Sequence, residues 1–287
     1  MNKTNIKRIT GFLKPFSKHA NSMLNHNQNQ RIILLYHGIS KSHQFNCVAQ
    51  NLFRDQISWI KEEYSVVPLF KLVEGLKFPT MYKSNLASIT FDDGYVNFAE
   101  LAVPILEKYG CHATVFIPAG KVGSFNDWDE GNSNFHKMPI MSYEQIRQLP
   151  KEFVEIGSHG ISHLRMNCLP ADGIVREIVE SRLEIEQMVG KPVRFFAFPF
   201  GVYPVRCGFN FYENGKKLLR SYLAACTTWW GRYNSPKDIY TLRRIGIWDS
   251  DSFEDFVDKL DGHYDWLVAK EKIKRIYKFI TSLPKSL

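Results

Sequence analysis

The sequence has no long hydrophobic run, and its cysteines are few and irregularly spaced. No segment approaches the ~20 apolar residues of a transmembrane helix, and none near the start resembles the apolar core of a secretory signal peptide. The five cysteines among 287 residues are odd in number and include no CxxC pair. This pattern argues against a disulfide scaffold and against a structural zinc site. We therefore expect a cytoplasmic protein.

Acidic residues are missing from the start of the chain. Asp55 is the first carboxylate, and basic residues interleaved with apolar ones at near-helical spacing precede it. Residues 1–30 are therefore expected to form a basic arm on the anionic inner face of a membrane. Residues 269–287 show the same mixture and are expected to form a basic C-terminal tail or helix. A solvated basic arm is the alternative, because Pro15 interrupts the first segment.

The net charge of +8 raises the question of a nucleic-acid partner. No helix-turn-helix, zinc-finger or RNP-like pattern accompanies this charge, so we expect no nucleic-acid binding. An acidic or lipid-linked glycan, built on the cytoplasmic face of a membrane, would explain both the charge and the missing signal peptide.

Short apolar runs alternate with helical patterns along most of the chain. Such alternation indicates parallel strands joined by helical crossovers. A length of 287 residues suits one barrel-like α/β domain, which we place at residues 31–268. The expected strands lie near 32–37, 86–91, 113–118, 153–157, 194–199, 223–227 and 241–247, and the expected helices near 97–110, 143–149, 173–189, 213–220 and 252–261.

Residues 89–95 (ITFDDGY) end an apolar run in two adjacent carboxylates. Aspartate is rarely buried without a partner, so Asp92 and Asp93 require a cation, a proton relay or open solvent. A DDG sequence by itself is more often an ordinary turn.

A second polar cluster follows another apolar run. His159 and His163 are spaced i, i+4, and one helical turn would place both imidazoles on one face. Two imidazoles and one carboxylate suit zinc, cobalt, nickel or ferrous iron, and they leave positions open for water and substrate. One aspartate can then ligate the metal while its neighbour takes a proton from the attacking water.

Three segments resemble the motifs of a known family. Residues 90–94 (TFDDG) and 158–163 (SHGISH) are similar to the first two motifs of the polysaccharide deacetylases, the carbohydrate esterase family 4 or NodB-homology group. Residues 196–201 (FAFPFG) look like the third motif. The resemblance spans roughly residues 31–268.

This resemblance implies a distorted (β/α) barrel that holds a divalent metal and hydrolyses N-acetyl groups, less often O-acetyl groups, on a glycan. It makes Asp93, His159 and His163 the metal ligands and Asp92 the general base. It also implies that the backbone N–H of Phe200 stabilises the oxyanion. Zinc is the expected metal, with cobalt and nickel as alternatives.

Two positions depart from the family pattern. Many members begin the third motif with an arginine that orients the catalytic aspartate, but Ala197 occupies this position. Another group must therefore orient Asp92. Many members also carry a general-acid histidine near the C-terminal end of the barrel, where this chain has only His263 in a different context.

The missing acid has a candidate near the start of the domain. The chain resembles the circularly permuted deacetylases of exopolysaccharide assembly, in which the acid-bearing strand lies at the N-terminus. Residues 31–37 (RIILLYH) fit that strand, so we expect His37 to protonate the leaving amine. The alternative is a structural histidine that caps the strand.

Aromatic side chains are the natural lining of a sugar groove, because the C–H faces of a pyranose pack on rings. Ordinary core packing is the alternative for each of them. Residues 124–134, rich in Asn, Asp, Ser and Gly, are expected to form a loop that shapes substrate binding. The residues expected to contact substrate are Tyr95, Trp128, Tyr203, Trp248 and Phe200.

Together these features predict a metal-dependent deacetylase acting on an N-acetylated glycan, free or lipid-linked. One rival is a hydrolase of another amide, such as a cyclic ureide or imide, on the same barrel, which should have a small closed pocket. A second rival is a non-catalytic glycan-binding module, which would most often have lost Asp92 or a metal ligand.

Overall fold

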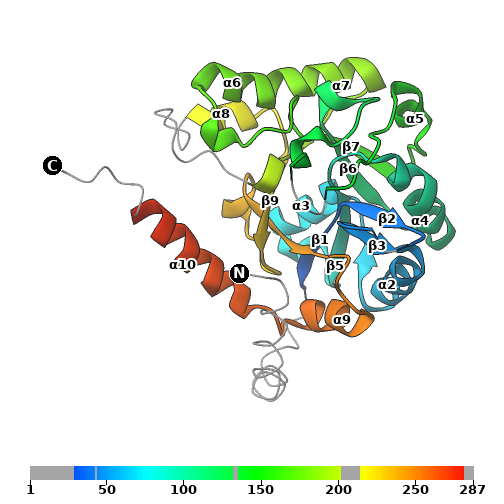
Figure 1. The fold of residues 1–287 in the computed structure, drawn as a ribbon. Helices are drawn as coiled ribbons and strands as arrows, with labels where there is room; N and C mark the ends of the chain where they lie inside the picture. The colour runs from blue at the N-terminus through cyan, green and yellow to red at the C-terminus, as the bar shows by residue number, and fades with distance from the viewer. Residues whose placement is uncertain (1–28, 43, 132–134, 202–213, 281–287) are drawn as a thin grey trace.

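The computed structural model describes residues 29–42, 44–131, 135–201 and 214–280. Parallel strands form a barrel in the order β1-β10-β9-β8-β7-β6-β5, and β5 pairs back with β1 to close it (Figure 1). The distorted (β/α) barrel predicted from the sequence is confirmed. The barrel strands are β1 (Arg31–Tyr36), β5 (Leu86–Phe91), β6 (Ala113–Ile117), β7 (Val154–Ser158), β8 (Phe195–Ala197), β9 (Ala224–Trp230) and β10 (Leu242–Gly246).

Short strands and helices surround the barrel. β4 (Ser65–Val66) pairs with β5 outside the closed ring, and β2 (Gly38–Ser40) pairs with β3 (Cys47–Ala49). The α-helices are α2 (Gln50–Glu63), α3 (Leu69–Lys77), α4 (Val103–Tyr109), α5 (Tyr143–Gln148), α6 (Ala171–Val175), α7 (Ser181–Val189), α8 (Asn214–Leu219), α9 (Phe253–Asp261) and α10 (Trp266–Ile280). The π-helical turns are η2 (Phe98–Ala102) and η6 (Arg176–Glu180), and the 3₁₀ turns are η1 (Pro79–Met81), η3 (Ala119–Lys121), η4 (Asp127–Asp129), η5 (Met166–Cys168), η7 (Pro199–Gly201) and η8 (Pro236–Asp238).

Local sequence signals set several helix ends. Ser142 and Ser252 cap α5 and α9 in capping boxes, each with a reciprocal bond from the third helical residue. Gly110 and Gly190 end α4 and α7 in the left-handed conformation, which glycine adopts without a Cβ clash.

In several barrel strands neighbouring residues belong to different packing clusters, as expected for strands with two buried faces. In β1, Ile32 and Leu34 pack in the larger cluster, whereas Ile33 packs in a second cluster with Phe116 and Ala197. Because Ile33, Phe116 and Ala197 come from β1, β6 and β8, we assign the second cluster to the barrel interior.

Helix α3 packs at the amino ends of the strands. Its residues Leu69, Leu72 and Leu76 share the interior cluster with Leu86, at the start of β5. A cavity of about 810 Å³ also lies at this end, among the residues that precede β6, β7 and β8. Helix α3 and this cavity therefore lie at the opposite end of the strands from the polar motifs, which follow the carboxyl ends.

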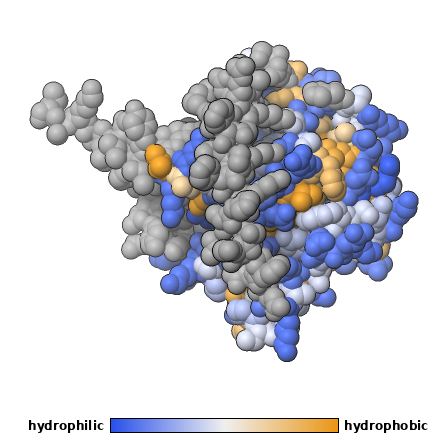
Figure 2. Space-filling model, turned by 90° about the horizontal axis from the view of Figure 1, so that it is seen from below, coloured by the Kyte–Doolittle hydropathy of each residue, from blue (hydrophilic) through white to orange (hydrophobic). Residues whose placement is uncertain are grey.

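Seen from below, apolar side chains gather on one part of the surface and are bordered by hydrophilic ones (Figure 2).

Among the helices of the described ranges, none combines the length and apolar character needed to cross a bilayer.

Candidate active site

The predicted site residues meet at the carboxyl end of the barrel. Asp92 and Asp93 follow β5, His159 follows β7 and His37 follows β1. Asp92, Asp93, His159 and His163 are all buried. Although they are separated in sequence, parallel pairing of the strands brings their ends to one edge, as in other barrels of this class.

Asp93, His159 and His163 form a cluster of three potential metal ligands. One ligand atom from each lies within 4.8 Å of the others. Oδ1 of Asp93 lies 3.4 Å from Nε2 of His159 and 3.2 Å from Nε2 of His163. Two imidazoles and one carboxylate with open positions make a set that binds borderline divalent metals.

The hydrogen bonding of His159 shows that these residues fit a metal. Its Nδ1 lies 2.8 Å from the carbonyl oxygen of Ala197, and a carbonyl only accepts, so Nδ1 carries the proton. In a neutral ring Nε2 is then an acceptor that faces the carboxylate of Asp93. Two facing acceptors require a cation between them. A divalent metal would satisfy both, and the bond to Ala197 would fix the ring as outer partners of metal ligands do.

His163 is held differently. Its Nδ1 is buried and has no hydrogen-bond partner among the described residues. Its ring lies between aromatic neighbours, with its centroid 3.9 Å from that of Trp128 and 4.7 Å from that of Phe200. Packing and backbone conformation, rather than a hydrogen bond, therefore orient this ligand.

The acid–base properties of the cluster follow from burial and from the facing acceptors. Burial alone would raise the pKa of Asp93, but hydrogen bonds from His159 and His163 hold it well below the ordinary value. Burial would lower the pKa of His159, yet Asp92 and Asp93 together raise it. Burial dominates at His163 and lowers its pKa.

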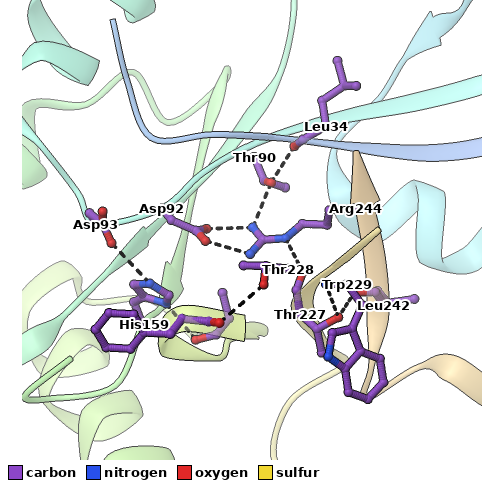
Figure 3. Close-up of polar contacts among 12 residues, drawn as sticks. Leu34, Thr90, Asp92, Asp93, His159, Thr227, Thr228, Trp229, Leu242 and Arg244 are labelled. Atoms are coloured by element: carbon purple, nitrogen blue, oxygen red, sulfur yellow. Dashed lines mark hydrogen bonds and ion pairs between the residues drawn. The ribbon is translucent and has the colours of Figure 1, made fainter. Parts of the chain in front are cut away.

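Asp92 points away from this cluster and is held by Arg244 of β10 (Figure 3). Nη1 and Nη2 of Arg244 donate to Oδ1 and Oδ2 of Asp92, each at 2.7 Å. Burial would raise the pKa of Asp92, but Arg244 and then His159 lower it below the ordinary value. Asp92 is therefore an ionised carboxylate beside the cluster of potential metal ligands, as a general base must be.

Arg244 is itself fixed by the barrel wall. Its side chain has no solvent exposure. Nε donates to the carbonyl oxygen of Thr227 at 2.8 Å, and Nη1 donates to the Thr90 hydroxyl at 3.1 Å. The Thr90 hydroxyl in turn donates to the carbonyl oxygen of Leu34 at 2.6 Å. The group that orients Asp92, which the sequence left open at Ala197, is Arg244.

Three site residues have the left-handed backbone that non-glycine residues rarely adopt. The φ angles are 73° at Asp93, 54° at His163 and 57° at Phe200. Such conformations cost about 1–3 kcal/mol each, and they persist where the surrounding structure imposes them. Their concentration in two potential metal ligands and in the predicted oxyanion residue marks this end of the barrel as the candidate functional one.

His37 lies beside Trp248, with ring centroids 5.4 Å apart in a stacked arrangement. Its Nδ1 is buried without a hydrogen-bond partner among the described residues. The side chain is half-buried, and a positive charge on it would favour the ionised forms of both Asp92 and Asp93. The structure thus places His37 near the predicted base, and its role as general acid stays a prediction.

The predicted substrate-contacting aromatics separate into three groups. Half-buried rings form the first group: Trp128 and Phe200 lie beside His163, and Trp248 lies beside His37. The guanidinium carbon of Arg165 lies 4.0 Å from the Phe200 ring centroid. Tyr203 lies outside the described residues.

The prediction that the Tyr95 ring lines a groove is wrong. Tyr95 is only 2% exposed and packs with Met138 and Ile140. Burial, followed by the neighbouring Asp93 carboxylate, raises the pKa of its hydroxyl well above the ordinary value. Tyr95 directly follows the DDG turn, and its buried ring packs in the core while its hydroxyl interacts with Asp93.

Sequence comparison places this site in a known family. The family profile described as polysaccharide deacetylase matches residues 81–212, which contain all three motifs. This stretch of the chain therefore matches the polysaccharide deacetylase family. The predictions of this family and of a hydrolase are confirmed. The matched region ends before Arg244 and begins after His37, so neither residue is part of it.

Individual relatives are distant but extensive. YxkH of Bacillus subtilis, which is named as a polysaccharide deacetylase, is 25% identical over 217 residues, 75% of this chain and 70% of that protein. The poly-β-1,6-N-acetyl-D-glucosamine N-deacetylase of Staphylococcus aureus is 26% identical over 204 residues, 62% of this chain and 67% of that protein.

Solved structures show the same fold. IcaB from Ammonifex degensii matches with a TM-score of 0.67 at 19% identity, over 81% of this chain and 97% of that one. The Streptococcus pyogenes deacetylase PplD in complex with acetate matches with a TM-score of 0.66 at 21% identity, over 81% and 99%.

Proposed function

We propose that this protein is a metal-dependent de-N-acetylase of a polymer or oligomer of N-acetylglucosamine. The observation that carries the proposal is that the two adjacent carboxylates have different partners. Asp93 shares the metal cluster with both histidines, whereas Asp92 is bound by Arg244 and stays available as a base.

A divalent metal held by Asp93, His159 and His163 would supply Lewis acidity to the acetyl carbonyl and would favour ionisation of the attacking water. Asp92 accepts the proton of that water. The backbone N–H of Phe200 donates to the developing oxyanion, a type of interaction often worth about 3–4 kcal/mol in the transition state. The water oxygen bonds to the carbonyl carbon, His37 donates a proton to the sugar nitrogen, and the C–N bond breaks to release acetate and the free amine.

The choice of substrate rests on the relatives. The S. aureus relative is named for poly-β-1,6-N-acetyl-D-glucosamine, and the family name denotes deacetylation of polysaccharide. We propose the same class of amide here, on a free or a lipid-linked glycan, with zinc as the first metal to test and cobalt and nickel as alternatives.

Acetate release from defined substrates tests this proposal. Metal-loaded wild-type protein and Asp92→Asn are incubated with β-1,6-linked and β-1,4-linked N-acetylglucosamine oligomers, an O-acetylated oligosaccharide and a cyclic imide. Release from an N-acetylated oligomer by wild type alone supports the proposal. Preferred hydrolysis of the imide would instead favour the other amide hydrolase, and equal background for both proteins on every substrate would favour a binding module.

We also propose that the protein works at an anionic membrane surface on the cytoplasmic side. The sequence of α10 contains five basic residues and only one acidic residue, Glu271. Glu271 is engaged by the backbone N–H of Trp230, and Ile273 is 68% exposed. Residues 1–28, the other basic segment, lie outside the described residues.

Co-sedimentation with vesicles tests this location. Binding to vesicles rich in phosphatidylserine that weakens with salt, and that weakens further when Lys270 and Lys272 are replaced by glutamate, supports the proposal. Absence of binding at low salt would contradict it.

A further inference from the structure

The loop that carries both histidines is held by a buried glutamate outside the cluster. Glu177 lies in η6, the π-helical turn between α6 and α7. It is 3% exposed and makes no ion pair with a cation among the described residues. The neighbouring Arg176 pairs with Glu180 instead. A buried carboxylate without a cation requires hydrogen-bond donors.

The backbone of the loop supplies these donors. Oε2 of Glu177 accepts from the N–H of Ile161 at 2.7 Å and from that of Ser162 at 3.2 Å. Oε1 accepts from the same Ser162 N–H at 3.2 Å. Gly160 has φ +79°, and a Cβ there would lie 2.4 Å from Oε2. The glycine of the SHGISH motif is therefore required both by its backbone conformation and by the close approach of Glu177.

The opposite side of the loop is bound by the segment that follows β6. The carbonyl oxygen of Gly160 accepts from Ala119 N–H at 2.8 Å, and that of Ile161 accepts from Gly120 N–H at 3.0 Å. The loop between the two histidines is thus held from two sides, through the carbonyl groups of Gly160 and Ile161 and through the N–H groups of Ile161 and Ser162.

The π turn is anchored so that Glu177 stays in place. The hydroxyl of Ser181 donates to the carbonyl oxygen of Glu177 at 2.6 Å, and that of Tyr222 donates to the carbonyl oxygen of Ile178 at 2.7 Å. Ser181 also lies 2.7 Å from the Ser158 hydroxyl at the end of β7. Wide turns of this kind break the regular carbonyl pattern and occur often at functional sites.

We propose that Glu177 is a positioning residue that presets His159 and His163 for metal binding. The inference rests on the proposed metal site. His159 has its own bond to Ala197, whereas Nδ1 of His163 has no partner among the described residues. Because the position of His163 depends on the backbone of this loop and on aromatic packing, without a hydrogen bond to its Nδ1, Glu177 acts chiefly through this second histidine.

Three variants test the proposal. Glu177→Ala removes both acceptors. Glu177→Gln keeps one oxygen for Ile161 but turns an amide donor toward Ser162. Glu180→Ala is the matched control, because Glu180 lies in the same turn, is exposed and pairs with Arg176. The measurements are zinc affinity by competition with a chromophoric chelator, hydrogen exchange of residues 159–163 in metal-free protein, and the thermal midpoint.

We expect zinc affinity to fall about 10–100-fold in Glu177→Ala, the range seen for outer partners of metal ligands, with an intermediate loss in Glu177→Gln. Exchange of the Ile161 and Ser162 amides should accelerate in the same order, and Glu180→Ala should match wild type in both. If Glu177→Ala does not fold, the Glu177→Gln comparison decides.

Unchanged zinc affinity and unchanged amide exchange in Glu177→Gln and any folded Glu177→Ala would overturn the inference. So would an affinity loss that Glu180→Ala reproduces. A wild-type protein that binds no zinc, cobalt or nickel would contradict the proposed function instead, and amide exchange in metal-free protein would still decide the role of Glu177.

Discussion

Arg244 donates through both terminal nitrogens to both carboxylate oxygens of Asp92, at 2.7 Å each, within the barrel interior. A bidentate pair fixes the plane of the carboxylate as well as its charge. The pair explains how the site functions with alanine at position 197, where many members of the family have arginine. A different strand supplies the guanidinium.

We predict that Arg244→Met lowers kcat/KM by about 100-fold or more, on the scale of a general base that is lost or misplaced. Without Arg244, burial would raise the pKa of Asp92, so the acidic limb of the pH profile should move to higher pH. The kcat/KM and the pH profile of Arg244→Lys should lie between those of wild type and Arg244→Met, because an ammonium cannot donate two parallel hydrogen bonds as a guanidinium does. The pH dependence of kcat/KM for acetate release measures both effects.

Arg243→Met is the matched control for this prediction. Arg243 precedes Arg244 on β10, donates to the carbonyl oxygen of Trp230 and makes no contact with Asp92. A pH profile for Arg244→Met that matches those of Arg243→Met and wild type would show that Arg244 does not tune Asp92.

The same pair predicts a pH-dependent stability. In wild type the pKa of Asp92 lies below the ordinary 3.8. The ionised Asp92 therefore stabilises the folded protein above pH 3.8, and this contribution is lost as the pH falls through the pKa of the folded state. In Arg244→Met the folded pKa would lie above the unfolded one, so acidification would relieve the cost of the buried charge. At neutral pH the variant should lose about 3–5 kcal/mol of unfolding free energy.

Urea denaturation of metal-free wild type and Arg244→Met, between neutral pH and pH ~4, measures how their stabilities change with pH. The difference in unfolding free energy should narrow as the pH falls. A difference that stays constant or widens would mean that Asp92 is not the group whose charge Arg244 stabilises.

Much of the fold was predictable because its signals are local. Each expected barrel strand is present, since buried parallel strands appear as continuous apolar runs. Helices α2 and α3 were not predicted. Their N-cap positions are Ala49 and Pro68, which supply no side-chain cap, and Gly75 interrupts the second.

The site was predictable only in part, for a different reason. Asp92 and Asp93 adjoin in sequence, and the histidines lie four residues apart, so the metal ligands form visible motifs. Arg244 lies 152 residues from Asp92, and only barrel closure brings them together. One signal was available: two successive arginines within an apolar strand, of which alternation must turn one inward.

His37 should act as an acid only where the leaving group needs a proton. We predict that His37→Gln lowers acetate release from an N-acetylated sugar by about 100-fold but leaves hydrolysis of an aryl acetate within a few-fold of wild type. An aryl oxide leaves without protonation, which separates acid catalysis from binding and metal loading.

Exposed His136 provides the control, as His136→Gln. Zinc affinity measured in parallel shows whether His37→Gln retains the metal. Equal losses on the amide and on the aryl ester would assign His37 a structural role at the end of β1.

The central claim is that Asp93, His159 and His163 hold a metal on which Asp92-dependent deacetylation depends. Its most direct measurement is acetate release from an N-acetylglucosamine oligomer by chelator-treated protein, before and after stoichiometric zinc, cobalt or nickel, with Asp92→Asn in parallel. We predict no release from metal-free protein, recovery in wild type with at least one metal, and background release by Asp92→Asn despite bound metal. Full turnover by metal-free wild type, or equal turnover by Asp92→Asn, would contradict the account.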